Sequence, residues 1–512
     1  MFSKIYSATL SGIESRVVSV EADVSDGLPV FEMVGALSVE VKEGKERVRT
    51  VIRSLGQRLP ARRITVNFSP ADLRKRGTGF DLPVALAVLS ALGNFQGVEI
   101  GDLFVAGELG LSGEVLPIRG ILPMLLAAKE AGLKRCLIPM DNMKEASFVP
   151  GLVLVGIRHI REAGDYLTKG RIPVQEVEES WEAVERSAVD FADVHGQENI
   201  RRACEIAAAG MHNLLMYGPP GAGKSLVAGA LPSILSPMTD QEKTEVMKIY
   251  SVSGKGNIQL VLDGQRPFRS PHHTITEIAM AGGGVSPRPG EITLAHRGVL
   301  FLDELPEFDR KTLEILRQPL EEHCIHISRN KTEDMYPAEF LLVAAMNPCK
   351  CGYYPSVKCH CSQHSIQQYI SRISQPLLDR FDLCAEAKKV KITELKNTRK
   401  EEDSGAIRER VVRAMERQRQ RYERSGCLFN SQVPSGKIIE YCELGPEENE
   451  YLDRIYEAKE LTVRGYYRIL RVARTIADLA GSSRVETSHL MEAVYYRTLD
   501  RRFWEVSEDV SF

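Results

Sequence analysis

The sequence predicts an α/β fold, because three short apolar runs with the character of buried strands each end in a polar motif. Residues 214–216 lead into a glycine-rich turn at 218–225, after which an apolar helix pattern begins. Residues 299–302 are wholly apolar and end at two carboxylates, and residues 340–346 end at an asparagine. Continuous apolar runs of this length are typical of parallel strands buried on both faces of a sheet.

The glycine-rich turn, GPPGAGKS, has the GxxxxGK[ST] pattern in the strand, turn and helix order of a phosphate-binding P-loop. Glycines let backbone N–H groups close around phosphates at a helix N-terminus, the lysine neutralises the outer phosphates and the serine hydroxyl holds Mg²⁺. The sequence therefore predicts binding of a nucleoside triphosphate. The expected binding residues are Gly218, Pro219, Pro220, Gly221, Ala222, Gly223, Lys224 and Ser225.

The acidic pair at the end of the second apolar run predicts hydrolysis of that nucleotide. Asp303 would hold Mg²⁺ together with Ser225, and Glu304 would polarise the water that attacks the γ-phosphate. Asn347, after the third run, is placed to orient the same water. An acidic pair is often only a surface turn, but its position after a buried strand downstream of a P-loop favours the catalytic interpretation.

Composition limits the remaining possibilities. At 512 residues, the chain is long enough for about three domains of roughly 100 to 200 residues. The net charge of −3 gives no global sign of nucleic-acid binding, so a DNA surface must be local. The N-terminus lacks a secretory stretch, and the longest apolar run, 82–92, falls short of the roughly 20 residues that span a bilayer. We expect a cytoplasmic protein without a membrane partner, and ten cysteines fit that reducing compartment.

The chain separates into blocks by composition. Residues 1–165 alternate strand-like runs with two helical patterns, and residues 166–190 are an acidic linker. Residues 191–390 contain the nucleotide motifs, and residues 391–512 are helical in pattern. One face of an Arg-rich helix in this last block is formed by Ile407, Val411, Met415, Gln418 and Tyr422.

Seven stretches of the chain, in order, resemble the magnesium-chelatase-like branch of the AAA+ ATPases, and the whole chain resembles the bacterial ComM competence protein family, also called YifB-like. They are residues 193–198, 218–225, 266–274, 287–292, 299–304, 345–349 and 377–382. The resemblance implies an AAA+ core with a C-terminal helical lid, ATP and Mg²⁺ as cofactors, and a homohexameric ring. It also places Val194 and His195 over the adenine, where backbone contacts would read the base.

The same resemblance assigns roles to arginines far from the P-loop. Arg380 would be the arginine finger that reaches into the neighbouring subunit. Arg464 in the lid would be the second sensor, with Arg468 as the alternative. Without the resemblance, each would be interpreted as a surface salt bridge or part of a helix face. The expected catalytic set is Lys224, Asp303, Glu304, Asn347, Arg380 and Arg464.

The N-terminal block resembles the proteolytic domain of Lon proteases in its order of elements, over residues 63–67, 72–83, 107–118 and 138–139. A Lon-type peptidase needs a serine nucleophile and a lysine. The expected serine turn reads GTGF at 77–80, and residues 119–124 contain no lysine. Thr78 stays a candidate nucleophile, but without its base we expect a non-catalytic scaffold.

Insertions around the acidic pair provide the candidate DNA contacts. In relatives, the loops between the P-loop and the acidic strand face the pore of a ring. Residues 325–329 and 335–342 predict a second hairpin with a basic tip, and basic tips in a pore suit a phosphate backbone. The alternative is that these are packing loops with solvated charges. The expected DNA-binding residues are Arg266, Arg269, Arg329 and Lys331.

Four clustered cysteines follow the third apolar run as a CxC pair, a gap of seven residues and a second CxC pair: Cys349, Cys351, Cys359 and Cys361. Four thiolates on a tight loop would close a tetrahedral Zn²⁺ site, although CxxC spacing is the commoner form. His360 and His364 are spare ligands. The alternative is a loop with free thiols.

The resemblance implies a hexameric, ATP-driven DNA translocase or helicase. It would promote branch migration in homologous recombination, as in natural transformation, on single-stranded or branched DNA. One alternative is a magnesium-chelatase-type motor subunit that remodels a metal-insertion partner, which the N-terminal block is expected to argue against. The other is an ATP-dependent peptidase, disfavoured by the missing serine and lysine.

Overall fold

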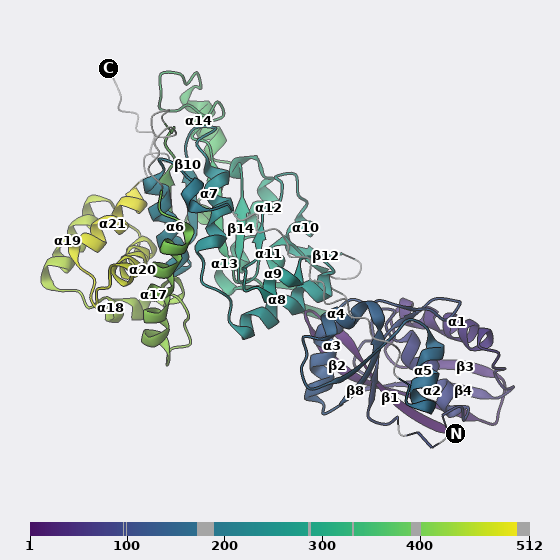
Figure 1. Cartoon of the computed structure of the whole chain (residues 1–512). Coiled ribbons are helices and arrows are strands. Elements are labelled where there is room, and N and C mark those ends of the chain that lie inside the picture. The colour runs from purple at the N-terminus through teal and green to yellow at the C-terminus, as the bar shows by residue number, and fades with distance from the viewer. Residues whose placement is uncertain are drawn as a thin grey trace. The chain divides into compact units, whose positions relative to one another are not determined.

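The computed structural model describes residues 1–95, 97–98, 100–171, 189–284, 288–329, 332–390 and 401–498, and it divides the chain into two compact units (Figure 1). The first unit comprises the described residues of Met1–Ala183 together with Thr244–Gln259 and Ser328–Tyr336. The second comprises the described residues of Val184–Lys243, Leu260–Ile327 and Pro337–Phe512. Two segments from within the predicted nucleotide block therefore fold with the N-terminal unit.

The first unit is built on a mixed seven-stranded sheet in the order β3-β4-β2-β1-β5-β8-β9. A long antiparallel hairpin forms its middle, with β2 also antiparallel to β4, and the other neighbouring pairs are parallel. The strands are β1 (Phe2–Ser11), β2 (Glu14–Ser25), β3 (Val30–Val34), β4 (Arg63–Ser69), β5 (Leu103–Val105), β8 (Arg135–Pro139) and β9 (Val153–Ile157), with β6 (Glu108–Leu109) and β7 (Val115–Leu116) forming a small separate pair.

The first unit contains more helix than the two helical patterns predicted. Its helices are α1 (Val39–Ser54), α2 (Asp81–Ala91), α3 (Ile121–Glu130), α4 (Met143–Ala146) and α5 (Ile160–Lys169). Helix α2 is buried at every position except Ser90, so apart from Asp81 and Ser90 its sequence is apolar and shows no polar face. This is why a search for amphipathic periodicity counts too few helices here.

The two inserted segments are anchored to the first unit by polar contacts. In the Thr244–Gln259 segment, Lys248 pairs with Glu14, and the Ser251 carbonyl accepts from the Gly120 N–H at 3.0 Å. In the Ser328–Tyr336 segment, the buried Asp334 accepts from Arg76 at 2.9 Å. These bonds tie the insertions to the first residue of β2, to the chain between β4 and α2, and to the start of α3.

The second unit contains a five-stranded, wholly parallel sheet in the order β11-β14-β17-β10-β18. The three predicted strands are present, and the α/β prediction is confirmed. The strands are β10 (Leu214–Tyr217), β11 (Phe268–Arg269), β14 (Val299–Leu302), β17 (Leu341–Met346) and β18 (Leu383–Glu386). Parallel strands end at the same edge of a sheet, so the motifs that follow β10, β14 and β17 are brought together.

Further helices and two small hairpins lie near these strands in sequence, and those parts of them that fall within 244–259 and 328–336 belong to the first unit. The helices are α6 (Glu198–Gly210), α7 (Lys224–Ala230), α8 (Asp240–Ser253), α9 (Ile258–Leu262), α10 (Glu277–Ala281), α11 (Glu291–Leu294), α12 (Arg310–Glu314), α13 (Arg317–Glu322), α14 (Gln363–Ile370) and α15 (Gln375–Leu378). The hairpins pair β12 (Gly282–Gly283) with β13 (Arg288–Pro289), and β15 (Cys324–Arg329) with β16 (Thr332–Pro337). The second strand predicted for the basic hairpin, 335–342, is wrong in its bounds, because β16 ends at Pro337 and β17 begins at Leu341.

The C-terminal part of the second unit is helical, as predicted, and its helices group beside α6 in Figure 1. They are α17 (Ser404–Tyr422), α18 (Ser435–Cys442), α19 (Pro446–Ala458), α20 (Val463–Ala480) and α21 (Thr487–Thr498). The predicted face of α17 is buried, and its Gln418 amide donates to the Ala209 carbonyl at the end of α6.

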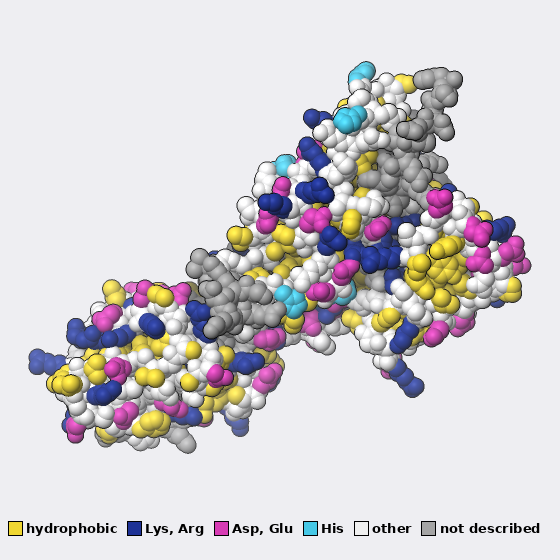
Figure 2. Space-filling view, turned by 180° about the vertical axis from the view of Figure 1, so that it is seen from behind, with side chains coloured by type: hydrophobic (Ala, Val, Ile, Leu, Met, Phe, Trp, Pro, Cys, Tyr) yellow, Lys and Arg dark blue, Asp and Glu magenta, His cyan; other side chains and the backbone are white. Residues whose placement is uncertain are grey.

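Surface charge agrees with the balanced composition. Figure 2 shows Lys and Arg side chains interspersed with Asp and Glu over the face that it presents. Among the described residues, no helix is long and apolar enough to cross a bilayer.

Candidate nucleotide-binding and hydrolysis site

The P-loop connects the carboxyl end of β10 to the first residue of α7. Gly221 and Gly223 have φ of 73° and 81°, in the left-handed region where a side chain is strained. A Cβ on Gly218 would lie 2.3 Å from the Ala387 carbonyl oxygen, so bulk is excluded there as well. The glycines of the motif are therefore required by backbone geometry before any ligand is considered.

The ends of three strands surround one cavity of about 370 Å³. It is lined by Pro220, Gly221, Ala222, Gly223, Lys224, Ser225, Leu226, Asp303, Glu304, Met346 and Asn347. The structure thus brings together the P-loop, the acidic pair and the asparagine that the sequence places far apart.

Polar side chains in this cavity are already connected to one another. The Ser225 hydroxyl donates to Asp303 Oδ2 at 2.6 Å. Lys224 Nζ donates to Asn347 Oδ1 at 3.1 Å and to the Gly218 carbonyl at 2.7 Å. A hydroxyl beside a carboxylate is an all-oxygen set of the kind that Mg²⁺ prefers, so Ser225 and Asp303 fit that ion.

Lys224 is the cation of the site, and its side chain is mostly buried. Burial lowers the pKa of Lys224, whereas the nearby carboxylates of Asp303 and Glu304 raise it. A buried ammonium is stabilised by an opposite charge and by hydrogen bonds. The phosphates of a nucleotide would supply both in this cavity.

Glu304 is positioned differently from its neighbour. Its backbone has φ of 51°, its side chain is 57% exposed, and its N–H donates to Asp303 Oδ1 at 2.9 Å. The exposed carboxylate is free to reach a water molecule, while Asp303 is held by Ser225. His273 Nδ1 lies 3.9 Å from Glu304, a neighbour that the sequence analysis did not identify although His273 is within the matched stretch 266–274.

Gln197 is a second residue that the sequence analysis missed. This buried side chain donates from Nε2 to the carbonyls of Ala222 at 2.9 Å and Lys388 at 2.5 Å, and its Oε1 accepts from the Lys388 N–H at 3.2 Å. It therefore ties the P-loop to the chain after β18. The only sequence signal was its place in the matched stretch 193–198.

We expect Gln197→Leu to lower the free energy of unfolding by about 2 to 3 kcal/mol, because it leaves buried backbone groups of Ala222 and Lys388 unpaired. Urea unfolding measures this loss. Gln367→Leu makes the same chemical change at an exposed position of α14 and should stay within about 0.5 kcal/mol of the wild type. Equal stability of the two variants would contradict the role of Gln197.

The segment predicted to cover the adenine precedes α6. Val194 is buried and belongs to the core, whereas His195 is half-buried. Neither residue lines the cavity around the P-loop. Their contact with the base stays a prediction.

Arg380 does not line the cavity of its own chain either. It pairs with Glu321, and its Nε has no hydrogen-bond partner among the described residues. Burial lowers the pKa of Arg380, and the positive charges of Arg464 and Arg317 lower it further, so Arg464 lies near it.

The two candidates for the second sensor differ in their surroundings. Arg464 is exposed, whereas Arg468 is buried and 3.6 Å from Asp382. Of the two sensor candidates, only Arg464 would reach a ligand without breaking an ion pair.

The predicted DNA contact by Arg266 is contradicted by the structure. Its side chain is 3% exposed and bonds to Glu242, to both oxygens of Ser236 and to the Arg297 carbonyl. A guanidinium saturated in this way is structural. Arg269 pairs with Glu291 at 2.6 Å and is 29% exposed. The side chain of Arg329 and the whole of Lys331 lie outside the described residues.

The predicted metal ligands Cys349, Cys351, Cys359 and Cys361 lie together on the loop between β17 and α14.

Thr78, the candidate nucleophile of the Lon-like block, lies in the first unit, and its hydroxyl donates to the Glu108 carboxylate. Lys75, the buried lysine nearby in sequence, instead donates to the Pro70 carbonyl.

Comparison with protein families gives three matches. The model described as magnesium chelatase, subunit ChlI, matches residues 190–395, and that of the ChlI C-terminal region matches residues 401–497. The model described as subunit ChlI of Mg-chelatase matches residues 20–142. The N-terminal block was expected to argue against a chelatase-type motor, but it matches a model with a chelatase description as well, so it does not separate the two functions.

Full-length relatives are also found. The chain is similar to competence protein ComM of Haemophilus influenzae, with 39% identity over 513 residues, covering 98% of this chain and 99% of the relative. It is similar to protein YifB of Escherichia coli, with 38% identity over 501 residues, 98% of this chain and 97% of the relative. A Lon protease of Mycolicibacterium smegmatis is 28% identical over 176 residues, which cover 33% of this chain and 22% of that protein.

Proposed function

Because this chain belongs to the ComM and YifB family of magnesium-chelatase-like AAA+ proteins, we propose that it is a hexameric motor that hydrolyses ATP to move along DNA and promotes branch migration in homologous recombination. Membership of this family indicates an ATPase that uses ATP and Mg²⁺. One observation carries the proposal: the P-loop, Asp303, Glu304 and Asn347 line a single cavity.

Each of these residues has a chemical task in hydrolysis. Lys224 neutralises the outer phosphates, and Ser225 with Asp303 would hold Mg²⁺, which withdraws charge from the phosphate oxygens. Glu304 accepts a proton from the attacking water, because its exposed carboxylate is the one not held by Ser225. Asn347, held by Lys224, orients that water.

The hexameric part of the proposal is supported by Arg380. A cation is needed opposite the γ-phosphate as charge develops there, and Arg380 does not line its own chain's cavity. In a ring of head-to-tail contacts, each subunit offers the same residue to its neighbour. Arg380 would therefore act in the adjacent site.

The DNA part is supported by the similarity of this chain to a competence protein, ComM of Haemophilus influenzae. The alternative is a chelatase-type motor that remodels a protein partner, favoured by the match of residues 20–142 to a chelatase subunit. The two proposals differ in what stimulates ATP hydrolysis.

We expect single-stranded or branched DNA to stimulate the ATPase. We also expect Arg329→Ala/Lys331→Ala to weaken DNA binding equally on all sequences and to flatten its salt dependence, by about one unit of log–log slope per lost phosphate contact at most. Basal hydrolysis without DNA should be kept, because the catalytic groups lie elsewhere.

Fluorescence anisotropy against salt, paired with ATPase rates with and without DNA, measures both effects. As a matched control, Arg454→Ala/Lys437→Ala removes two exposed lid cations. It should leave the DNA affinity, its salt dependence and the ATPase rates unchanged. Full stimulation of the Arg329→Ala/Lys331→Ala variant by DNA would exclude the basic hairpin as the DNA-binding element. A wild type that never responds to DNA would favour the chelatase-type alternative.

A further inference from the structure

We propose that Cys349, Cys351, Cys359 and Cys361 bind one Zn²⁺, and that this zinc site holds the P-loop and Asn347 in the geometry that binds nucleotide. The sequence leaves the choice between metal and free thiols open. The arrangement of the sulfur atoms and the packing of their loop support both halves of the proposal.

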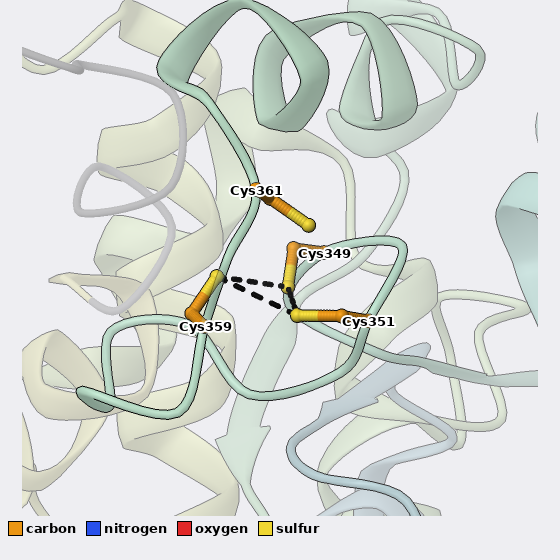
Figure 3. A group of neighbouring side chains, drawn as sticks. All are labelled: Cys349, Cys351, Cys359 and Cys361. Atoms are coloured by element: carbon orange, nitrogen blue, oxygen red, sulfur yellow. Dashed lines mark hydrogen bonds between the residues drawn. The ribbon is translucent and has the colours of Figure 1, made fainter.

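Four side chains from two short segments point toward one another in Figure 3. Cys349 Sγ lies 3.3 Å from Cys351 Sγ and 3.7 Å from Cys359 Sγ, and the last two are 3.5 Å apart. All four sulfur atoms, Cys361 included, lie within 4.8 Å of one another. Four ligands at the Zn–S distance of about 2.3 Å sit roughly 3.8 Å apart in a tetrahedron, so the spacing suits one central ion.

The ligand set indicates which ion. Four thiolates form a soft donor set, and tetrahedral sulfur sites select zinc or iron rather than Mg²⁺ or Ca²⁺. Among the described residues, this set of possible metal ligands consists of the four cysteines, with no carboxylate or imidazole. Such a closed set leaves no open position for a substrate, which is the arrangement of a structural zinc site.

The position of the loop connects it to the nucleotide site. Its first ligand is two residues after Asn347, whose Oδ1 accepts from Lys224. Directly after the second ligand, Gly352 packs on the P-loop, because a Cβ there would lie 2.5 Å from Pro220 Cδ. Gly352 also has φ of 82°, and its N–H donates to the Cys349 carbonyl at 2.9 Å.

The loop is therefore linked to both sides of the cavity. It is covalently continuous with Asn347, and its Gly352 packs against Pro220 of the P-loop. Zinc would close this loop without a hydrophobic core of its own, since metal binding supplies folding free energy to small segments. Loss of the ion would release Gly352 from Pro220 and loosen Asn347. This consequence rests on the proposed nucleotide binding, whereas the metal site itself does not.

The metal half is tested on the full chain purified without chelator. Elemental analysis and native mass spectrometry should find one zinc per chain in the wild type and none in Cys351→Ser/Cys359→Ser. Cys427→Ser, which alters a half-buried cysteine outside the cluster, should keep its zinc. A wild type without zinc, iron in its place, or zinc retained by the double variant would overturn the site.

The coupling half is tested by measuring the affinity for a fluorescent ATP analogue in three states of the protein. These are the zinc-loaded protein, the protein after a mercurial and a chelator have removed the zinc, and the protein after a thiol and zinc have restored the site. We expect affinity to fall about tenfold on removal, the equivalent of one or two hydrogen bonds of the P-loop, and to return with zinc. Gly352→Ala should keep its zinc and still bind nucleotide more weakly, because it displaces Pro220 and leaves the ligands intact.

These measurements separate the two claims. Equal affinity with and without zinc, or wild-type affinity in Gly352→Ala, would overturn the coupling. If the zinc-loaded wild type binds no nucleotide, the proposed ATPase function fails and the coupling fails with it, while the zinc content still decides the metal site.

Discussion

Glu304→Gln should lower kcat for ATP hydrolysis about 10²- to 10⁴-fold while leaving nucleotide affinity close to that of the wild type. The amide has the same shape but cannot accept the proton of the attacking water. Among the described residues, Glu304 forms no hydrogen bond or ion pair with the P-loop, and Asp303, which is bonded to Ser225, stays in place. Binding and chemistry are therefore expected to separate at this residue.

The measurement pairs equilibrium binding of a fluorescent ATP analogue with steady-state phosphate release. Lys224→Ala should lose binding itself, because it removes the buried cation of the site. Glu307→Gln, an exposed carboxylate three residues further along that pairs with Arg372, is the matched control and should hydrolyse ATP normally. If Glu304→Gln and Lys224→Ala lose nucleotide binding equally, Glu304 is not the residue that activates water.

The arrangement of the proposed hydrolysis site was predictable because phosphate chemistry restricts sequence locally. Gly221, Gly223 and Lys224 are fixed by backbone geometry and charge within eight residues of chain, so the motif predicts its own conformation. Asp303 and Asn347 were predictable from the apolar strands before them, since parallel strands end at one edge of a sheet. The large separation of these residues in sequence did not hinder the prediction, because the apolar strand pattern places each of them at the carboxyl end of a strand.

Residues whose role depends on a partner elsewhere in the fold were not predictable. Arg266 was expected to contact DNA because it lies in the insertion between the P-loop and the acidic strand, but Glu242 and Ser236, 24 and 30 residues before it, bind its guanidinium. Gln197 was missed because a glutamine carries no chemical signature until its backbone partners are known. Likewise, nothing in the segment containing Asp334 indicates that it belongs to the N-terminal unit.

Arg380→Ala should reduce kcat about 10³-fold or more, the range in which arginine fingers contribute to phosphoryl transfer, and still bind ATP. The guanidinium is absent from the lining of its own chain's cavity, so its loss should not disturb the P-loop. Arg484→Ala removes an exposed lid arginine and is expected to leave hydrolysis unchanged.

The decisive measurement mixes two inactive proteins. Arg380→Ala keeps an intact P-loop, and Lys224→Ala keeps an intact finger, so an interface between them in the right order contains both parts. In an equal mixture of freely exchanging subunits, about a quarter of the interfaces in a head-to-tail ring would be competent, and ATPase activity should recover accordingly. A finger that acted within its own chain would give no recovery at any ratio, because every subunit would lack one part. Activity that stays absent in rings shown to exchange subunits would therefore contradict the role of Arg380 between neighbours.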